Sequence, residues 1–218
     1  MARRAAVLDV MGMLFDLSSL RPRFVEVGAP GAALEAWFGR ALHSATALTL
    51  ADEFRPFSEI AGSTIRTTLA EFGCDPDRGQ EVLAGLAVLQ PYPEADEALK
   101  TLQDAGVEMI TLTNGTEENT HALLEHAGLT GYFDAVVTVA EVEAYKPHPV
   151  VYARAVEVLG LPKVAITMVA AHAWDVVGAR NAGLGAIWID RTEGEWPLPV
   201  EPVLRAPDLL AAARLLKA

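Results

Sequence analysis

One stretch near the start of the chain decides its fold: Ala5-Ala6-Val7-Leu8-Asp9-Val10-Met11-Gly12. The apolar run at 5–8 is typical of a buried parallel strand, and Asp9 ends that strand. Gly12 then allows a tight loop. Ligands of open α/β sheets bind at the carboxyl ends of the strands, so Asp9 stands where a reacting carboxylate is useful. An aspartate in this place also fits a plain turn or a helix cap, and both interpretations stay open here.

The composition describes an acidic globular chain. Its 218 residues are enough for one core, or for one core with a small inserted domain, and 51% of them are hydrophobic. The net charge of −12 argues against nucleic acid as a partner, but it allows a small anionic substrate in a cleft. Cys74 is the single cysteine, which excludes an internal disulfide and favours the cytoplasm. No apolar run approaches the ~18–20 residues of a membrane span, so we expect no membrane partner.

Residues 15–91 have the pattern of an all-helical insertion. Apolar residues recur at helical spacing between Leu34 and Leu50, which predicts a long helix there. Further helices are predicted over 57–72 and 77–86. The proline-rich segment at 90–93 marks the end of the insertion.

From Pro93 onward, predicted helices and strands alternate. The helices are expected at 94–105, 117–127, 150–159, 176–182 and 207–216, and the strands at 107–112, 135–139, 164–169 and 186–189. This alternation is typical of a parallel sheet with helices on both faces. We therefore predict an α/β fold with two parts: a Rossmann-like core of residues 1–14 and 92–218, and a helical cap of residues 15–91 inserted after the first strand.

Polar residues follow the second predicted strand of the core. Thr113 and Asn114 bring a hydroxyl and an amide into the loop before a helix, whose free N–H groups are close by. This pair suits an anion such as a carboxylate or phosphate. An ordinary helix cap, made by Thr116 with Asn119, is the competing interpretation.

A lysine and a histidine complete the set of candidate reactive groups. Lys146 lies between Tyr145 and Pro147, a position that suits holding Asp9 ionised and binding an anion, although a surface lysine is the simpler reading. His172 follows the fourth strand and can activate water near neutral pH, although a lone histidine is often structural. Asp175 can orient either of them. The sequence has no metal-ligand spacing of histidines and no glycine-rich phosphate loop, so we expect no metal and no cofactor.

Taken together, these segments resemble the haloacid dehalogenase superfamily and, within it, the L-2-haloacid dehalogenases. The resemblance covers nearly the whole chain and rests on the Asp9 loop, Thr113-Asn114-Gly115, Tyr145-Lys146-Pro147 and Ala173-Trp174-Asp175, which follow in the family's order. It implies the haloacid dehalogenase fold, with a Rossmann-like core and an inserted cap. It also implies a cytoplasmic hydrolase, and it allows a homodimer.

The resemblance implies an activity as well. In it, Asp9 attacks C2 of a short (S)-2-haloacid and expels halide, and water then hydrolyses the aspartyl ester to a 2-hydroxy acid. The catalytic residues it implies are Asp9, Lys146, His172 and Asp175. The substrate-binding residues it implies are Val10, Met11, Phe38, Leu42, Phe57, Thr113, Asn114, Tyr152 and Trp174.

Two other functions stay in view. A Mg²⁺-dependent phosphatase of this fold needs acids at positions that hold Met11 and Ala171 here, which disfavours it. A vestigial protein that binds a small carboxylate is favoured by Met13, Phe38 and Ala170, which replace the family's threonine, cap arginine and serine. His172 replaces the family's asparagine and, in the dehalogenase reading, takes over its role in activating water.

Overall fold

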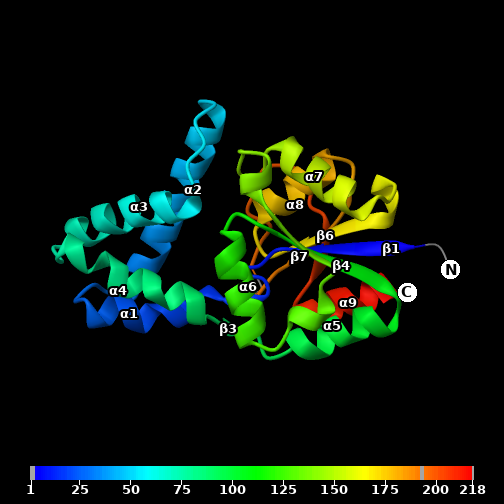
Figure 1. Cartoon of the computed structure of the whole chain (residues 1–218), viewed down its shortest axis with the longest axis horizontal. Helices are drawn as coiled ribbons and strands as arrows, with labels where there is room; N and C mark the ends of the chain where they lie inside the picture. Colours follow the sequence, from blue (N-terminus) through cyan, green and yellow to red (C-terminus); the bar gives the residue numbers. More distant parts are fainter. Residues whose placement is uncertain (1–2, 192–193, 218) are drawn as a thin grey trace.

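A parallel sheet forms the centre of the larger lobe (Figure 1). The computed structural model describes residues 3–191 and 194–217, so residues 1–2, 192–193 and 218 of the predicted core lie outside the described residues. The sheet has six strands in the order β5-β4-β1-β6-β7-β8, and every neighbouring pair is parallel. The strands are β1 Arg4–Leu8, β4 Val107–Thr113, β5 Ala135–Thr138, β6 Ile166–Ala170, β7 Gly185–Ile189 and β8 Leu204–Ala206.

Helices cover both faces of this sheet. α5 and α9 pack against each other on one face, and α7 and α8 lie on the opposite face (Figure 1). The helices of this lobe are α5 Ala95–Asp104, α6 Glu117–His126, α7 Pro149–Leu159, α8 Ala173–Asn181 and α9 Leu209–Lys217. The predicted α/β fold is confirmed.

A helical lobe stands beside the sheet (left in Figure 1). Its helices are α1 Arg21–Glu26, α2 Ala33–Leu50, α3 Phe57–Glu71 and α4 Gly79–Leu83. Two short strands, β2 Phe15–Asp16 and β3 Gln90–Pro91, pair antiparallel, so the chain enters and leaves this lobe side by side. The limits of the cap at residues 15 and 91 stay a prediction.

The register of the sheet brings the polar strand ends together. β1 lies between β4 and β6, and its last residue, Leu8, is opposite Thr111 on one side and Val169 on the other. Asp9 therefore emerges at the same edge as the loops that follow β4 and β6.

The third predicted cap helix, at 77–86, is wrong as a single helix. The structure divides this segment into a 3-10 turn at Pro76–Arg78, the short α4, and a second 3-10 turn at Ala84–Val88. The two glycines in it pack closely on neighbours. A Cβ on Gly79 would lie 2.7 Å from Ile65, and a Cβ on Gly85 would lie 2.5 Å from Leu20. Helix propensity is weak at these glycines, so contacts with neighbouring side chains decide that the segment forms two 3-10 turns around a short α-helix.

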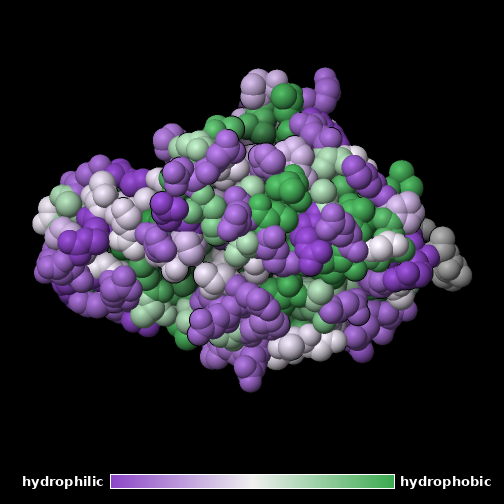
Figure 2. Space-filling view, turned by 45° about the horizontal axis from the view of Figure 1, so that its top comes forward, coloured by the Kyte–Doolittle hydropathy of each residue, from purple (hydrophilic) through white to green (hydrophobic). Residues whose placement is uncertain are grey.

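Two further differences concern the core. β8, the outer strand, has no counterpart among the predicted strands because it is only three residues long and two of those are exposed. α8 begins at Ala173 rather than at residue 176, so that Asp175 lies in its first turn. Figure 2 shows polar residues spread over the visible face, with hydrophobic residues in small groups among them. In the described part of the chain, no helix is long and apolar enough to cross a membrane.

α7 packs tightly against α8 at Gly178 of α8. A Cβ on Gly178 would lie 2.5 Å from the hydroxyl oxygen of Tyr152 and 2.7 Å from the Cβ of Pro147. The missing side chain therefore lets Tyr152 of α7 reach beneath α8.

Gly178→Ala and Gly39→Ala form a matched pair with opposite expected signs. Both glycines lie inside helices, and among the described residues nothing is within 4 Å of a Cβ on Gly39. We expect Gly39→Ala to stabilise the protein by about 0.5–1 kcal/mol through helix propensity. Gly178→Ala should destabilise it by about 1–3 kcal/mol through overpacking. Urea unfolding followed by circular dichroism measures both, and shifts of the same sign would contradict the packing argument.

Candidate active site

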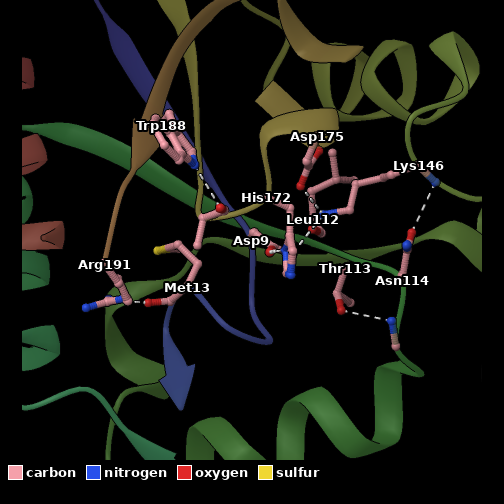
Figure 3. Close-up of polar contacts among 12 residues, drawn as sticks. Asp9, Met13, Leu112, Thr113, Asn114, Lys146, His172, Asp175, Trp188 and Arg191 are labelled. Atoms are coloured by element: carbon pink, nitrogen blue, oxygen red, sulfur yellow. Dashed lines mark hydrogen bonds and ion pairs between the residues drawn. The ribbon is translucent and has the colours of Figure 1, made fainter. Parts of the chain in front are cut away.

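A buried lysine joins two carboxylates at the carboxyl edge of the sheet (Figure 3). The Nζ of Lys146 lies 2.8 Å from Oδ1 of Asp9 and 2.6 Å from Oδ2 of Asp175. It also donates to the main-chain carbonyl of Leu112, at 2.8 Å. An ammonium group has three donors, so all three are used. Lys146 is 2% exposed, which rules out the reading of a surface lysine.

This lysine keeps Asp9 charged. Burial alone would raise the pKa of Asp9, but the Lys146 ammonium and then the hydrogen bond with His172 outweigh burial and lower that pKa to about 2. The stability that ionised Asp9 contributes is therefore present above its usual pKa and is lost as the pH falls toward that lowered value. Burial opposes the charge of Lys146 too, but Asp175 and Asp9 raise its pKa. Lys146 therefore stays protonated.

Asp175 is held from both of its oxygens. Its Oδ2 accepts from Lys146, and its Oδ1 lies 2.8 Å from the Tyr152 hydroxyl, which donates to it. Burial, the largest effect, raises the pKa of Asp175. Burial and the Asp175 charge also raise the pKa of Tyr152, which keeps its hydroxyl protonated as a donor. Asp175 thus contacts Lys146 with one oxygen and Tyr152 with the other, and its role in orienting the lysine stays a prediction.

His172 lies on the other side of Asp9. Its Nδ1 is 3.3 Å from Oδ2 of Asp9, so the two carboxylate oxygens have different partners (Figure 3). The preceding residue is fixed as well, because Trp188 Nε1 donates to the Ala171 carbonyl at 2.9 Å. His172 is the N-cap residue of α8.

A small cavity of about 20 Å³ opens at Asp9, between the two lobes. We call it the cap–core cavity. The residues that line it are Asp9, Met11, Phe38, Leu42, Phe57, Thr113, Asn114, Gly115, His172 and Trp174. The structure thus brings together residues of the loop after β1, the end of β4 and its loop, α2, α3 and the start of α8, which are far apart in the sequence.

Two predicted substrate-binding residues, Val10 and Tyr152, lie outside the lining of this cavity. Val10 is fully buried, and its carbonyl accepts from the N–H groups of Leu14 and Phe15. Tyr152 is also fully buried, and its hydroxyl reaches Asp175 instead of the cavity. Sequence position alone does not reveal that Tyr152 contacts Asp175 and does not line the cavity itself.

Thr113 and Asn114 present donors to the cavity. The hydroxyl oxygen of Thr113 accepts from the Gly115 N–H at 2.9 Å, which leaves its proton to donate. The Asn114 Oδ1 accepts from the Lys146 N–H at 3.1 Å, so its amide group is the end that can serve a ligand. Thr116 accepts from the N–H of Asn119 and caps α6. The cap interpretation therefore holds for Thr116, and the other two residues lie in the cavity.

Three contributors were missed by the sequence analysis. Gly115 lines the cavity, where a Cβ would lie 3.3 Å from the end of Met11. Its position directly after Thr113-Asn114 could have indicated that it lies at the site. The Leu112 carbonyl is a main-chain group and leaves no trace in the residue types. Arg191 donates to the Met13 carbonyl at 2.6 Å and pairs with Glu94 at 2.9 Å. It lies in no motif.

The cap and the core are tied together next to the lysine. The Tyr145 N–H donates to Thr49 of α2 at 3.0 Å, and its hydroxyl donates to the Arg55 carbonyl at 2.7 Å. The Tyr145 ring stacks on Phe54, with ring centroids 5.5 Å apart. The cap therefore holds the residue that precedes Lys146.

Cations and metal ligands are scarce around the cavity. Its described lining residues include no arginine and no lysine. Arg40 and Arg55 of the cap pair with Glu71 and Glu53. No group of three histidine, cysteine, aspartate or glutamate side chains in residues 3–191 and 194–217 is arranged to hold a metal ion.

Comparison with known proteins identifies the family. Residues 7–183 match the model of the haloacid dehalogenase-like hydrolases. The chain belongs to this family. It is 32% identical to an (S)-2-haloacid dehalogenase from Pseudomonas sp. (strain YL), covering 87% of this chain and 83% of the relative. It is 29% identical to haloacetate dehalogenase H-2 from Moraxella sp. (strain B), covering 86% and 85%.

The chain also resembles a solved structure of the family in its three-dimensional fold. The L-2-haloacid dehalogenase from Xanthobacter autotrophicus with chloropropionic acid covalently bound superposes with a TM-score of 0.85. The match covers 100% of this chain and 99% of that one, at 25% identity. The resemblance inferred from the sequence motifs is thereby confirmed, and the protein is a hydrolase of this family.

Lys146→Met tests the balance of charge in the site. The variant leaves two buried carboxylates without their cation, so we expect it to lower the free energy of unfolding by about 3–5 kcal/mol. The matched control is Arg154→Met, which breaks the surface pair with Glu141, where both side chains are over 30% exposed. That change should lower the free energy of unfolding by about 0–1 kcal/mol. Equal losses in urea unfolding would contradict the role given to Lys146.

Proposed function

We propose that this protein is a metal-independent 2-haloacid dehalogenase that converts a short (S)-2-haloacid to a 2-hydroxy acid and halide. One observation carries the proposal. The Asp9 carboxylate is ionised, its Oδ1 is held by Lys146, and the residue lines a small cavity with mostly apolar walls. A carboxylate in such surroundings is a nucleophile toward carbon.

Ester formation uses the Asp9–Lys146 pair. Oδ2 of Asp9 attacks C2 of the haloacid, a new C–O bond forms, and the carbon–halogen bond breaks with its electron pair leaving on the halide. The hydroxyl of Thr113 and the amide of Asn114 would hold the substrate carboxylate by donating to it. Because no proton moves in this step, it needs neither an acid nor a metal.

Ester hydrolysis uses His172. A water placed between the imidazole and the Asp9 ester loses a proton to Nδ1 as its oxygen attacks Cγ of Asp9. The Cγ–O bond to the substrate then breaks, and the leaving alkoxide takes the proton back from Nδ1. The new carboxyl group of Asp9 releases its remaining proton to solvent, which restores the carboxylate. Nδ1 of His172 lies 3.3 Å from Oδ2 of Asp9, so the imidazole is close enough to share a water with Cγ of the ester.

The size of the cavity supports a short substrate. The cavity of about 20 Å³ is little larger than the space that one water molecule needs, so it leaves no room for a long-chain acid. Met11, Phe38, Leu42, Phe57 and Trp174 would wall the carbon and halogen atoms. The relatives' names, haloacetate dehalogenase and (S)-2-haloacid dehalogenase, point the same way.

Location and assembly are further parts of the proposal. We infer a cytoplasmic protein, because Cys74 is a free cysteine and the reaction needs no oxidising compartment. A homodimer through the cap is also proposed, and the apolar Leu50 and Phe72, 80% and 41% exposed, support it.

Halide release with and without Asp9 tests the proposed reaction. We expect the protein to release chloride from chloroacetate and from L-2-chloropropionate in buffer that contains EDTA. Asp9→Asn should lower that release by about ten-thousand-fold or more, because the nucleophile is gone. Circular dichroism of the variant checks that it still folds.

Other outcomes would separate the rival functions. If neither acid releases halide but a plain short carboxylate binds, the protein is a carboxylate-binding member of the family. If p-nitrophenyl phosphate is hydrolysed only with Mg²⁺, it is a phosphatase.

His172→Ala tests the second step. Ester formation does not involve proton transfer, so the first burst of halide should persist. Ester hydrolysis should slow by about 10²–10⁴-fold, because the general base is removed. The ester would then accumulate on Asp9 and be seen as added mass in intact-protein mass spectrometry during turnover. Absence of the adduct, with unchanged turnover, would remove His172 from the mechanism.

A further inference from the structure

The His172 imidazole lies between two aromatic rings. Its centroid is 5.1 Å from the ring of Trp174, nearly parallel at 24°, and 5.6 Å from the ring of Phe38, tilted by 39°. Trp174 belongs to α8, two residues along, whereas Phe38 belongs to α2 of the cap. The imidazole thus contacts one ring that belongs to the core and one that belongs to the cap.

Two more neighbours fix the edges of the same ring. Nδ1 faces Oδ2 of Asp9 at 3.3 Å. On another edge the imidazole lies against Gly12, where a Cβ would come within 3.2 Å of Cε1 of His172. Gly12 has a φ of +80°, so its backbone also favours glycine. Three of these four neighbours come from the core, and only Phe38 comes from the cap.

A second cavity shows where the imidazole would go without Phe38. This cavity, of about 360 Å³, lies between cap and core and is lined by both Phe38 and His172, together with Gly12, Leu34, Tyr92 and Arg191 among others. Phe38 and His172 therefore form the partition between it and the cap–core cavity. Removing the Phe38 ring would give the imidazole room to rotate toward the larger space and away from Asp9.

We propose that Phe38, besides lining the cap–core cavity, is the positioning residue for His172 and acts through this base on ester hydrolysis. This inference rests on the proposed function. It gives one reason for two departures from the dehalogenase pattern, since the residues in place of the family's arginine and asparagine are in ring contact. In this proposal the two residues act as a pair: Phe38 of the cap holds the imidazole of His172, the base from the core, in its orientation toward Asp9.

Phe38→Leu tests the proposal, because leucine keeps apolar bulk but removes the ring. Rapid-quench halide release measures ester formation, and the decay of the ester on Asp9, followed by mass spectrometry, measures hydrolysis. We expect the rate of ester hydrolysis, divided by the rate of ester formation in the same variant, to fall by about ten- to a hundredfold, because a misplaced base slows only hydrolysis. Phe38→Tyr keeps the ring and should restore hydrolysis. If Phe38→Leu fails to fold, Phe38→Met replaces it.

A double-mutant cycle and a matched variant exclude a merely structural role. In a His172→Ala background, Phe38→Leu should have no further effect on ester hydrolysis, because the base it aims is absent. Leu42→Ala, one helical turn along α2, removes volume from the same cavity wall and should alter substrate binding without changing the ratio of the two rates. Equal slowing of both steps by Phe38→Leu, or additive effects in the cycle, would overturn the proposal. Loss of the halide burst in wild-type protein would instead refute the proposed function.

Discussion

The contact on which the site depends is the Lys146 ammonium between two buried carboxylates. Neither Asp9 nor Asp175 could stay ionised at this depth without it, since burial favours the neutral acid. Much of the surrounding structure serves to place this one group. The Leu112 carbonyl accepts the third hydrogen bond of the Lys146 ammonium, and the Tyr152 hydroxyl donates to the second oxygen of Asp175. A helix glycine in α8 makes room for that tyrosine.

The cap takes part in the same arrangement from two directions. Tyr145 binds the cap by its N–H, its hydroxyl and its ring, and Lys146 is the next residue in the chain. Phe38 reaches from α2 to the imidazole on the other side of Asp9. Asp9 is thus flanked by the Lys146 ammonium and the His172 imidazole, and each of these groups lies next to a contact with the cap. The cap both encloses the cavity and fixes the geometry within it.

The sequence predicted the reactive residues that follow strands. It did not predict the features that depend on how side chains pack in three dimensions. Asp9, Thr113, Lys146 and His172 follow predicted strands, and the parallel register brings all four to one edge. The third cap helix broke up because its glycines touch neighbours, which no helix periodicity encodes. In the sequence, Phe38 and His172 are two separate departures from the dehalogenase pattern, with nothing to connect them. Their contact across the lobes depends on how the cap sits, and residue types do not carry that information.

Charge in the site has a consequence for how the products leave. Lys146 is shared by two carboxylates, so the three groups carry a net charge of minus one, and no other cation lines the cavity among its described residues. In the proposed reaction the ester removes that negative charge, so the intermediate tolerates the substrate's carboxylate beside it. Hydrolysis restores Asp9 as an anion next to an anionic hydroxy acid, and like-charge repulsion then favours departure. In the proposed reaction, hydrolysis of the ester thus both forms the hydroxy-acid anion and creates the charge on Asp9 that repels it from the cavity.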